Sequence, residues 1–214
     1  MKTPLLLTAA TAAALTLSAC NKQTHAVAND TGNSDLSSMN PGQTAPVNAA
    51  QDAMGAAVGA TSATIMGPRD TGAFVDNAGQ SNMYEVDAAK IAQEKSKNAE
   101  VTAFAKKMVS DHTAMMTQMK PLIAAAQKTP PTDLDQRRKG FLDNLRAAGP
   151  ADFDKVYIDQ QVAAHEETLT LLKGYADNGD DAGLKAAAAK AIPEVQAHLD
   201  RAKAIQAKLG AAAH

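Results

Sequence analysis

Aromatic residues are scarce in this sequence: Phe, Trp and Tyr make up 3% of its 214 residues, and Trp is absent. Hydrophobic residues nevertheless account for 45% of the chain, which is enough to form a substantial core. Ala, Leu, Val, Ile and Met must supply most of that core. Because such side chains fill a core well when helices pack closely, the composition favours an all-α protein.

An excess of basic residues is also missing. Lys and Arg total 21 and Asp and Glu total 23, so the formal net charge is −2 at pH 7. Proteins that bind nucleic acid depend on clustered Lys and Arg side chains to neutralise phosphates. Nucleic acid is therefore not an expected partner.

Cysteine occurs once, at position 20, so no internal disulfide can stabilise the fold. Residues 17–20, Leu-Ser-Ala-Cys, resemble the bacterial lipobox, in which cleavage leaves the cysteine as a lipidated amino terminus. Lys2 and the short apolar run from Leu5 to Leu17 are typical of an export signal. The alternatives are an ordinary signal peptide and a buried helix with an incidental cysteine. The position of the single cysteine favours the lipobox.

We therefore predict a signal peptide over residues 1–19 and a membrane anchor formed by acyl chains on Cys20. Asn21 stands where a retention-type Asp would be, which favours the outer membrane, facing the periplasm, over the inner membrane. Residues 20–67 are rich in small and polar residues and have few charges, so we expect a disordered, lipidated linker. Residues 68–210 are expected to form the folded domain.

Beyond Pro68, apolar residues recur at every third or fourth position, as in helices that pack against one another. Thr132 and Asp135 resemble a capping box, and Pro121 is expected to kink a helix. One of the expected helices is short and connects the second long helix to the third. At 1.5 Å per residue it is about 24 Å long, so it can carry the chain back along the bundle, which makes the second and third long helices parallel. We predict a ferritin-like four-helix bundle. Its first helix is capped by Asp70 or Thr71 and runs to about Lys95, and the second, capped by Asn98, spans Glu100 to Gln127. Further helices are expected from Asp133 to Ala148, from Ala151 to about Ala176, and from a cap at Asp180 or Asp181 to about Leu209.

Four polar residues occupy core-facing positions of the long helices: Glu85, His112, His165 and His198. His112 and His165 lie at similar distances from the starts of two helices that are expected to be parallel. Glu85 and His198 fall within about one helical turn of the same level. These side chains are therefore expected to meet near the middle of the bundle.

Three segments resemble the motifs of one bacterial family. Residues 104–113 (FAKKMVSDHT) match the pattern FAxxMxxDHT, and residues 153–159 with 164–166 are similar to FDxxYxD followed by HxE. Residues 192–198 (IPEVQAH) resemble the closing motif (L/I)P…H. Over about residues 70–208 the chain thus resembles the bacterial domain of unknown function 4142 (DUF4142). The resemblance implies a ferritin-like helical bundle in an exported, outer-membrane protein, and it implies no particular activity.

Ferritin-like carboxylate sites use a Glu from each of two helices and a Glu-x-x-His pair from each of the other two. In this sequence Val109, Val162 and Val195 stand three residues before the three histidines. The pattern therefore argues against an oxygen-activating di-iron centre.

A simpler site would hold one Zn, Fe or Cu ion between His112, His165 and His198, with Glu85 as a further candidate ligand. Met108, Met115 and Met119 share the core-facing side of their helix with His112 and would suit Cu(I), although methionine also fills gaps in cores. The alternative is that each histidine is a core residue, hydrogen-bonded to Glu85, Asp111, Tyr84 or Tyr157.

The sequence has no phosphate-binding loop and no Ser/His/Asp arrangement, so no catalytic residue is assigned. The leading interpretation is a non-enzymatic, lipid-anchored protein of the bacterial envelope, with a structural role or a surface for an envelope partner or for self-association. The second interpretation is the metal-binding bundle. Histidine nitrogens that converge near metal–ligand distance would favour the second interpretation, and histidines with separate hydrogen-bond partners would favour the first.

Overall fold

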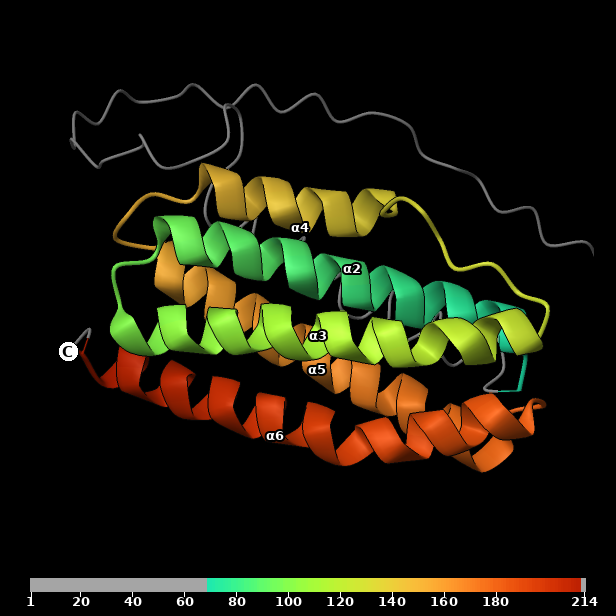
Figure 1. The fold of residues 1–214 in the computed structure, drawn as a ribbon. Coiled ribbons are helices and arrows are strands. Elements are labelled where there is room, and N and C mark those ends of the chain that lie inside the picture. Colours follow the sequence, from blue (N-terminus) through green and yellow to red (C-terminus); the bar gives the residue numbers. More distant parts are fainter. Residues whose placement is uncertain (1–68, 213–214) are drawn as a thin grey trace, which may run out of the picture. The chain divides into compact units, whose positions relative to one another are not determined.

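A computed structural model describes residues 69–212, and these residues form five α-helices and no β-strand (Figure 1). The prediction of an all-α fold is confirmed. The predicted signal peptide, the lipidation site at Cys20 and the predicted linker lie outside the described residues. The helices are α2 (Thr71–Lys95), α3 (Ala99–Ala125), α4 (Gln136–Ala147), α5 (Phe153–Asn178) and α6 (Ala182–Ala212).

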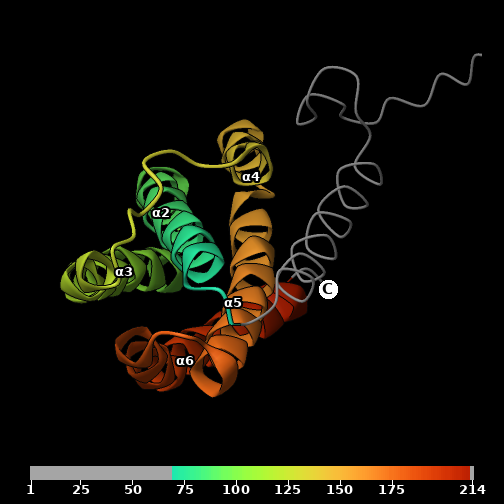
Figure 2. The same ribbon diagram turned by 90° about the vertical axis from the view of Figure 1, so that its right-hand side faces the viewer.

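The four long helices form a bundle in which α2 packs on α3 and α5 packs on α6. Further contacts of α2 with α5 and of α3 with α6 close the bundle. In Figure 1, α3 and α5 run in the same direction, as predicted from the length of the connecting helix. The short helix α4 lies outside the group of four, against α2 and α5 (Figure 2). No helix in the described part of the chain is long and apolar enough to cross a membrane.

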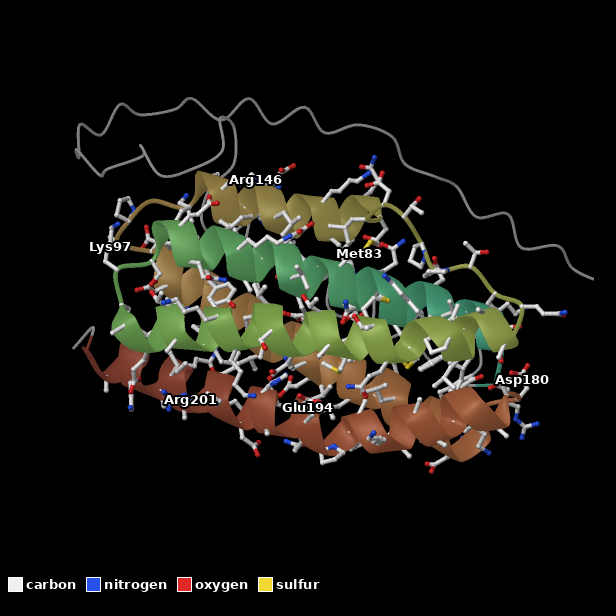
Figure 3. All side chains as sticks on the ribbon, viewed as in Figure 1. Met83, Lys97, Arg146, Asp180, Glu194 and Arg201 are labelled. Carbon is white, nitrogen blue, oxygen red and sulfur yellow. The ribbon has the colours of Figure 1, made fainter. Side chains whose placement is uncertain are left out.

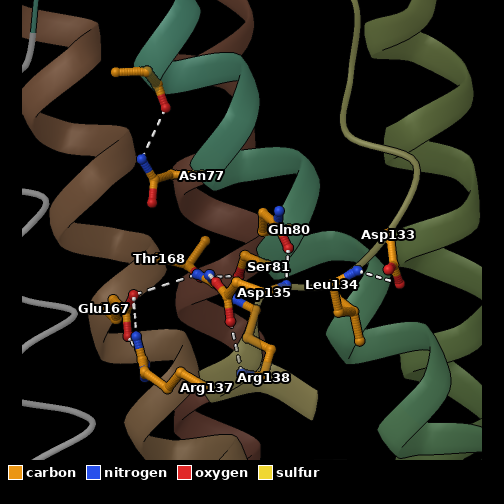
Figure 4. Close-up of polar contacts among 11 residues, drawn as sticks. Asn77, Gln80, Ser81, Asp133, Leu134, Asp135, Arg137, Arg138, Glu167 and Thr168 are labelled. Carbon is orange, nitrogen blue, oxygen red and sulfur yellow. Dashed lines mark hydrogen bonds and ion pairs between the residues drawn. The ribbon is translucent and has the colours of Figure 1, made fainter.

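Polar contacts attach α4 to the bundle (Figure 4). Arg137 donates to Glu167 of α5 at 3.1 Å, and Arg138 donates to the same carboxylate at 3.4 Å. The backbone N–H of Asp135 donates to the Gln80 side chain of α2 at 2.9 Å. The connecting helix is thus fixed to the two long helices that it crosses.

The short helix begins later than predicted. The expected capping box placed its start at Asp133 and its cap at Thr132, whereas α4 begins at Gln136 with Asp135 as its cap. The Asp135 carboxylate accepts a hydrogen bond from the backbone N–H of Arg138 at 2.7 Å, so it satisfies a donor that the first turn leaves free. Asp135 therefore precedes the helix instead of lying in its first turn.

The other helix ends lie within three residues of the predicted ones. Asp70 caps α2 and Asn98 caps α3, as expected from the sequence. Pro121 lies inside α3, and the helix continues past it. Four of these ends differ from the prediction by two or three residues: α3 ends at Ala125, α5 begins at Phe153 and ends at Asn178, and α6 reaches Ala212.

Two clusters of buried apolar side chains fill the bundle. One contains Phe104, Tyr157 and Ile205, and the other contains Phe74 and Tyr175, whose rings stack with centroids 3.9 Å apart. Along α3, α5 and α6 the histidine positions fall between residues of the first cluster and residues of the second. The polar level of the bundle is therefore flanked by apolar packing along the bundle axis.

Candidate metal centre

The structure brings three histidines from three helices together in the core. His112 comes from α3, His165 from α5 and His198 from α6, and they are 4%, 1% and 1% exposed. Their ring centroids lie 5.6 to 5.9 Å apart. One possible ligand atom from each ring lies within 4.8 Å of the other two. This is the convergence that the parallel arrangement of α3 and α5 predicts.

Each ring is held by one of its nitrogens. Nδ1 of His112 is 3.2 Å from Oδ1 of Asn82, and Nδ1 of His165 is 2.8 Å from the backbone oxygen of Gln161. Nε2 of His198 is 2.8 Å from a carboxylate oxygen of Asp111. Because all three partners are oxygen acceptors, these nitrogens carry the proton and donate it. The hydrogen bonds thereby fix the tautomer of every ring.

The second nitrogen of each ring is buried and has no hydrogen-bond partner among the described residues: Nε2 of His112, Nε2 of His165 and Nδ1 of His198. In the tautomers set by the first three contacts, each of these atoms has a free lone pair. A buried polar atom without a partner costs free energy, and three neighbouring rings that each carry such an atom call for a common explanation. A single cation between them would satisfy all three.

The distances are compatible with such a cation after a small adjustment. Nitrogen ligands about 2.0–2.1 Å from a tetrahedral zinc ion are about 3.4 Å from one another. One ligand atom of each ring lies within 4.8 Å of those of the other two, so modest ring movements would close the site. Imidazole nitrogen suits Zn, Cu, Fe, Co and Ni, which limits the class of ion to these metals.

Burial also keeps the rings of His112 and His198 neutral. It lowers the pKa of His112 well below the usual 6.5, and the neighbouring charges of His165 and His198 lower it further. Burial lowers the pKa of His198 to about 4, although its hydrogen bond to Asp111 acts in the opposite direction. Both side chains are therefore deprotonated at pH 7, so their lone pairs are available to a metal without competition from protons.

Glu85 lies beside the centre but is not one of its three converging ligand groups among the described residues. Its carboxylate is 3.6 Å from Nδ1 of His165, the nitrogen that also contacts the backbone oxygen of Gln161. Burial raises the pKa of Glu85, while His165, the Gln161 side chain and Arg138 lower it. Glu85 is 1% exposed, and neither of its oxygens makes a regular hydrogen bond in the part of the chain that the structure describes. Glu85 therefore contacts the protonated side of a ligand ring.

The methionines named as candidate copper ligands take part in apolar packing. Met108 is fully buried in the cluster of Phe104 and Tyr157, and Met115 and Met119 pack against the other cluster. They fill space around the histidine level, as methionine does in cores with few aromatic residues.

Two of the histidine partners were missed by the sequence interpretation. Asn82 stands three residues before Glu85 and therefore on the same side of α2, which is a signal that the sequence contained. The Gln161 partner is a backbone oxygen, so no residue type could have revealed it. Of the partners that the core-residue alternative named, Asp111 contacts His198, whereas Tyr84 donates to Gln160 at 2.8 Å.

The family model described as "Domain of unknown function (DUF4142)" matches residues 55–205, which is more than half of the chain. The match confirms the resemblance that the three motifs indicate. No curated protein and no solved structure shows a significant match to the chain. The ferritin-like assignment therefore stays a prediction beyond the all-helical bundle itself.

Proposed function

The chain belongs to the DUF4142 family, and we propose that it binds one divalent transition metal ion through His112, His165 and His198. One observation carries this proposal. Three buried rings each place one ligand atom within 4.8 Å of those of the other two. Each ring also has one buried nitrogen without a hydrogen-bond partner among the described residues, while an oxygen acceptor holds its other nitrogen. Metal-binding histidines are held by such contacts in the same way, since the outer contact sets the tautomer and the orientation of the ring.

The charges around the rings suit a divalent ion. Three neutral imidazoles contribute no charge, so a buried cation would need compensation from nearby groups. Glu85 contacts His165 and Asp111 contacts His198, which places two carboxylates against the outer sides of two ligand rings. Asp111 also pairs with Lys107, so the two carboxylates balance two positive charges once that lysine moves away. This balance favours a divalent ion over Cu(I).

The core-residue alternative explains only half of the geometry. It requires a separate partner for each histidine, and Asn82, Gln161 and Asp111 supply those partners. It does not explain why three rings that each have an unpartnered nitrogen gather in one place. A bound ion explains both sets of contacts.

A metal titration of the full chain, purified in detergent and stripped with a chelator, tests the proposal. We expect one Co²⁺ or Zn²⁺ per chain and a Co²⁺ spectrum typical of nitrogen ligands. The variant with His112→Gln, His165→Gln and His198→Gln should bind none. A matched control, His25→Gln, removes a histidine outside the proposed centre and should keep the stoichiometry at one. Equal binding by the triple variant and the parent would refute the proposal.

We also propose that the protein is exported and anchored by acyl chains on Cys20, on the basis of the lipobox-like residues 17–20. Cys20→Ala should move the protein out of the membrane fraction and remove the acyl mass from its amino-terminal peptide, because the thiol that accepts the lipid is gone. Ser38→Ala should change neither result. Firm membrane association of Cys20→Ala, or an unmodified amino terminus in the parent, would contradict the anchor.

A further inference from the structure

A second group of possible ligands lies directly outside the histidine centre. Asp111, Glu194 and His198 each place one ligand atom within 4.8 Å of the others. Their exposure rises toward the surface: His198 is 1% exposed, the Asp111 side chain is 16% exposed, and Glu194 belongs to the exposed residues. Figure 3 shows Glu194 on α6, on the side of the bundle where α6 lies next to α3.

The two groups share the ring of His198. Its Nε2 contacts Asp111 in the outer group, and its Nδ1 is buried without a partner among the described residues. One imidazole ring therefore separates the outer carboxylates from the inner centre.

The outer group of Asp111, Glu194 and His198 also places charged side chains between the histidine centre and solvent. Of the three groups that hold the rings, Asn82 is a neutral amide and the Gln161 oxygen belongs to the backbone of α5. Asp111 is the anionic one, and its side chain is partly open to water. A hydrated cation is attracted to carboxylates before it loses its water, so the ion would approach at Asp111 and Glu194.

Lys107 stands at the same place. Its ammonium group is 2.5 Å from Asp111 and its side chain is 58% exposed, so without a metal ion it neutralises part of the local negative charge. An exposed ion pair of this kind contributes little to stability, so an arriving cation can displace the lysine easily. Until the Lys107 side chain moves away, its positive charge would repel that cation.

We propose that Asp111 and Glu194 form a capture site that takes a divalent transition metal ion from solvent and passes it, through His198, to the three-histidine centre. The inference rests on the proposed metal-binding function and adds a route to it. In this scheme Glu194 governs the rate of loading, because it contacts the ion only on the way in. Lys107 opposes loading.

Stopped-flow loading of Co²⁺ into the stripped full chain, with absorbance as the readout, tests the route. Glu194→Gln should lower the bimolecular rate constant roughly three- to tenfold and leave the equilibrium affinity within about twofold, because steering affects encounter rates. Lys107→Gln should raise the rate constant. The salt dependence of loading should be weaker in Glu194→Gln than in the parent.

Glu94→Gln is the matched control. Glu94 is also an exposed glutamate, but it lies twelve residues beyond Asn82 on α2, roughly 18 Å along the helix axis. Its removal should leave loading unchanged.

Equal loading rates in Glu194→Gln and the parent would overturn the route while leaving the metal centre intact. Faster dissociation of Co²⁺ from Glu194→Gln at an unchanged loading rate would also overturn it, because Glu194 would then be a ligand of the bound ion. A parent chain that binds no Co²⁺ would refute the proposed function, and the route with it.

Discussion

The metal-free protein is expected to lose thermal stability as the pH falls from about 7 to about 5. Burial lowers the pKa values of His112 and His198 in the folded state, so below the ordinary value of 6.5 the unfolded chain binds more protons. The stability that these histidines contribute is complete above pH 6.5 and declines as the pH falls toward the folded value, which is about 4 for His198. A loss of roughly 1–2 kcal/mol per histidine would lower the Tm by on the order of 10 °C.

The neighbouring charges act in known directions over this range. Burial raises the pKa of Glu85, so the folded state binds this proton more readily than the unfolded state does. The contribution of Glu85 to stability therefore increases as the pH falls, opposite to that of the histidines. The pKa of Asp111 is lowered from 3.8, which places its titration below the range. The histidines should therefore dominate the loss, and Glu85 should offset part of it.

Melting curves recorded by circular dichroism in chelator, from pH 7.5 to pH 5, measure the effect. The variant with all three histidines changed to Gln should show a flattened dependence, or a slight rise toward acid that comes from Glu85. Saturating Zn²⁺ should steepen the trend in the parent, because protons compete for the same nitrogens. A triple variant that loses as much Tm as the parent over this range would show that the histidines are not a coupled buried group.

The level of the histidine centre could be predicted because helix starts and helix direction determine it. His112 lies thirteen residues beyond the start of α3 and His165 twelve beyond the start of α5, and the two helices are parallel. Residues at equal distances from the starts of parallel helices lie at equal heights. Capping residues such as Asn98 made those starts visible in the sequence.

The chemistry of the centre could not be predicted in the same way. Spacing showed that Glu85 faces the core, but side-chain torsions decide that it contacts Nδ1 of His165 instead of joining the converging nitrogens. The start of α4 depends on a similar choice. Asp135 and Thr132 are both good caps, and a contact between the Asp135 backbone and Gln80, distant in sequence, accompanies the cap that forms.

Replacing Glu85 with Gln is expected to stabilise the metal-free protein and to weaken its affinity for a divalent ion. Glu85 is fully buried, and among the described residues neither of its carboxylate oxygens accepts a regular hydrogen bond. Its ionisation in the core therefore opposes folding. Gln keeps the shape and removes the charge, which should raise the Tm by about 3–6 °C if roughly 1–2 kcal/mol is recovered. The same carboxylate would compensate the bound ion and polarise the His165 ring. Its loss should therefore lower the affinity for Zn²⁺ by about 10- to 100-fold.

Two measurements on Glu85→Gln separate this explanation from a general change in packing. The Tm of the metal-free protein at pH 7.5 should rise, and competition with a chromophoric chelator should show the loss of Zn²⁺ affinity. The affinity for Ag⁺, a monovalent stand-in for Cu(I), should fall less than the affinity for Zn²⁺, because one lost charge matters less to a monovalent ion. Glu94→Gln, on the exposed side of α2, should change none of these values. A destabilised Glu85→Gln that binds both ions as the parent does would show that Glu85 serves the core and that the compensating charge lies elsewhere.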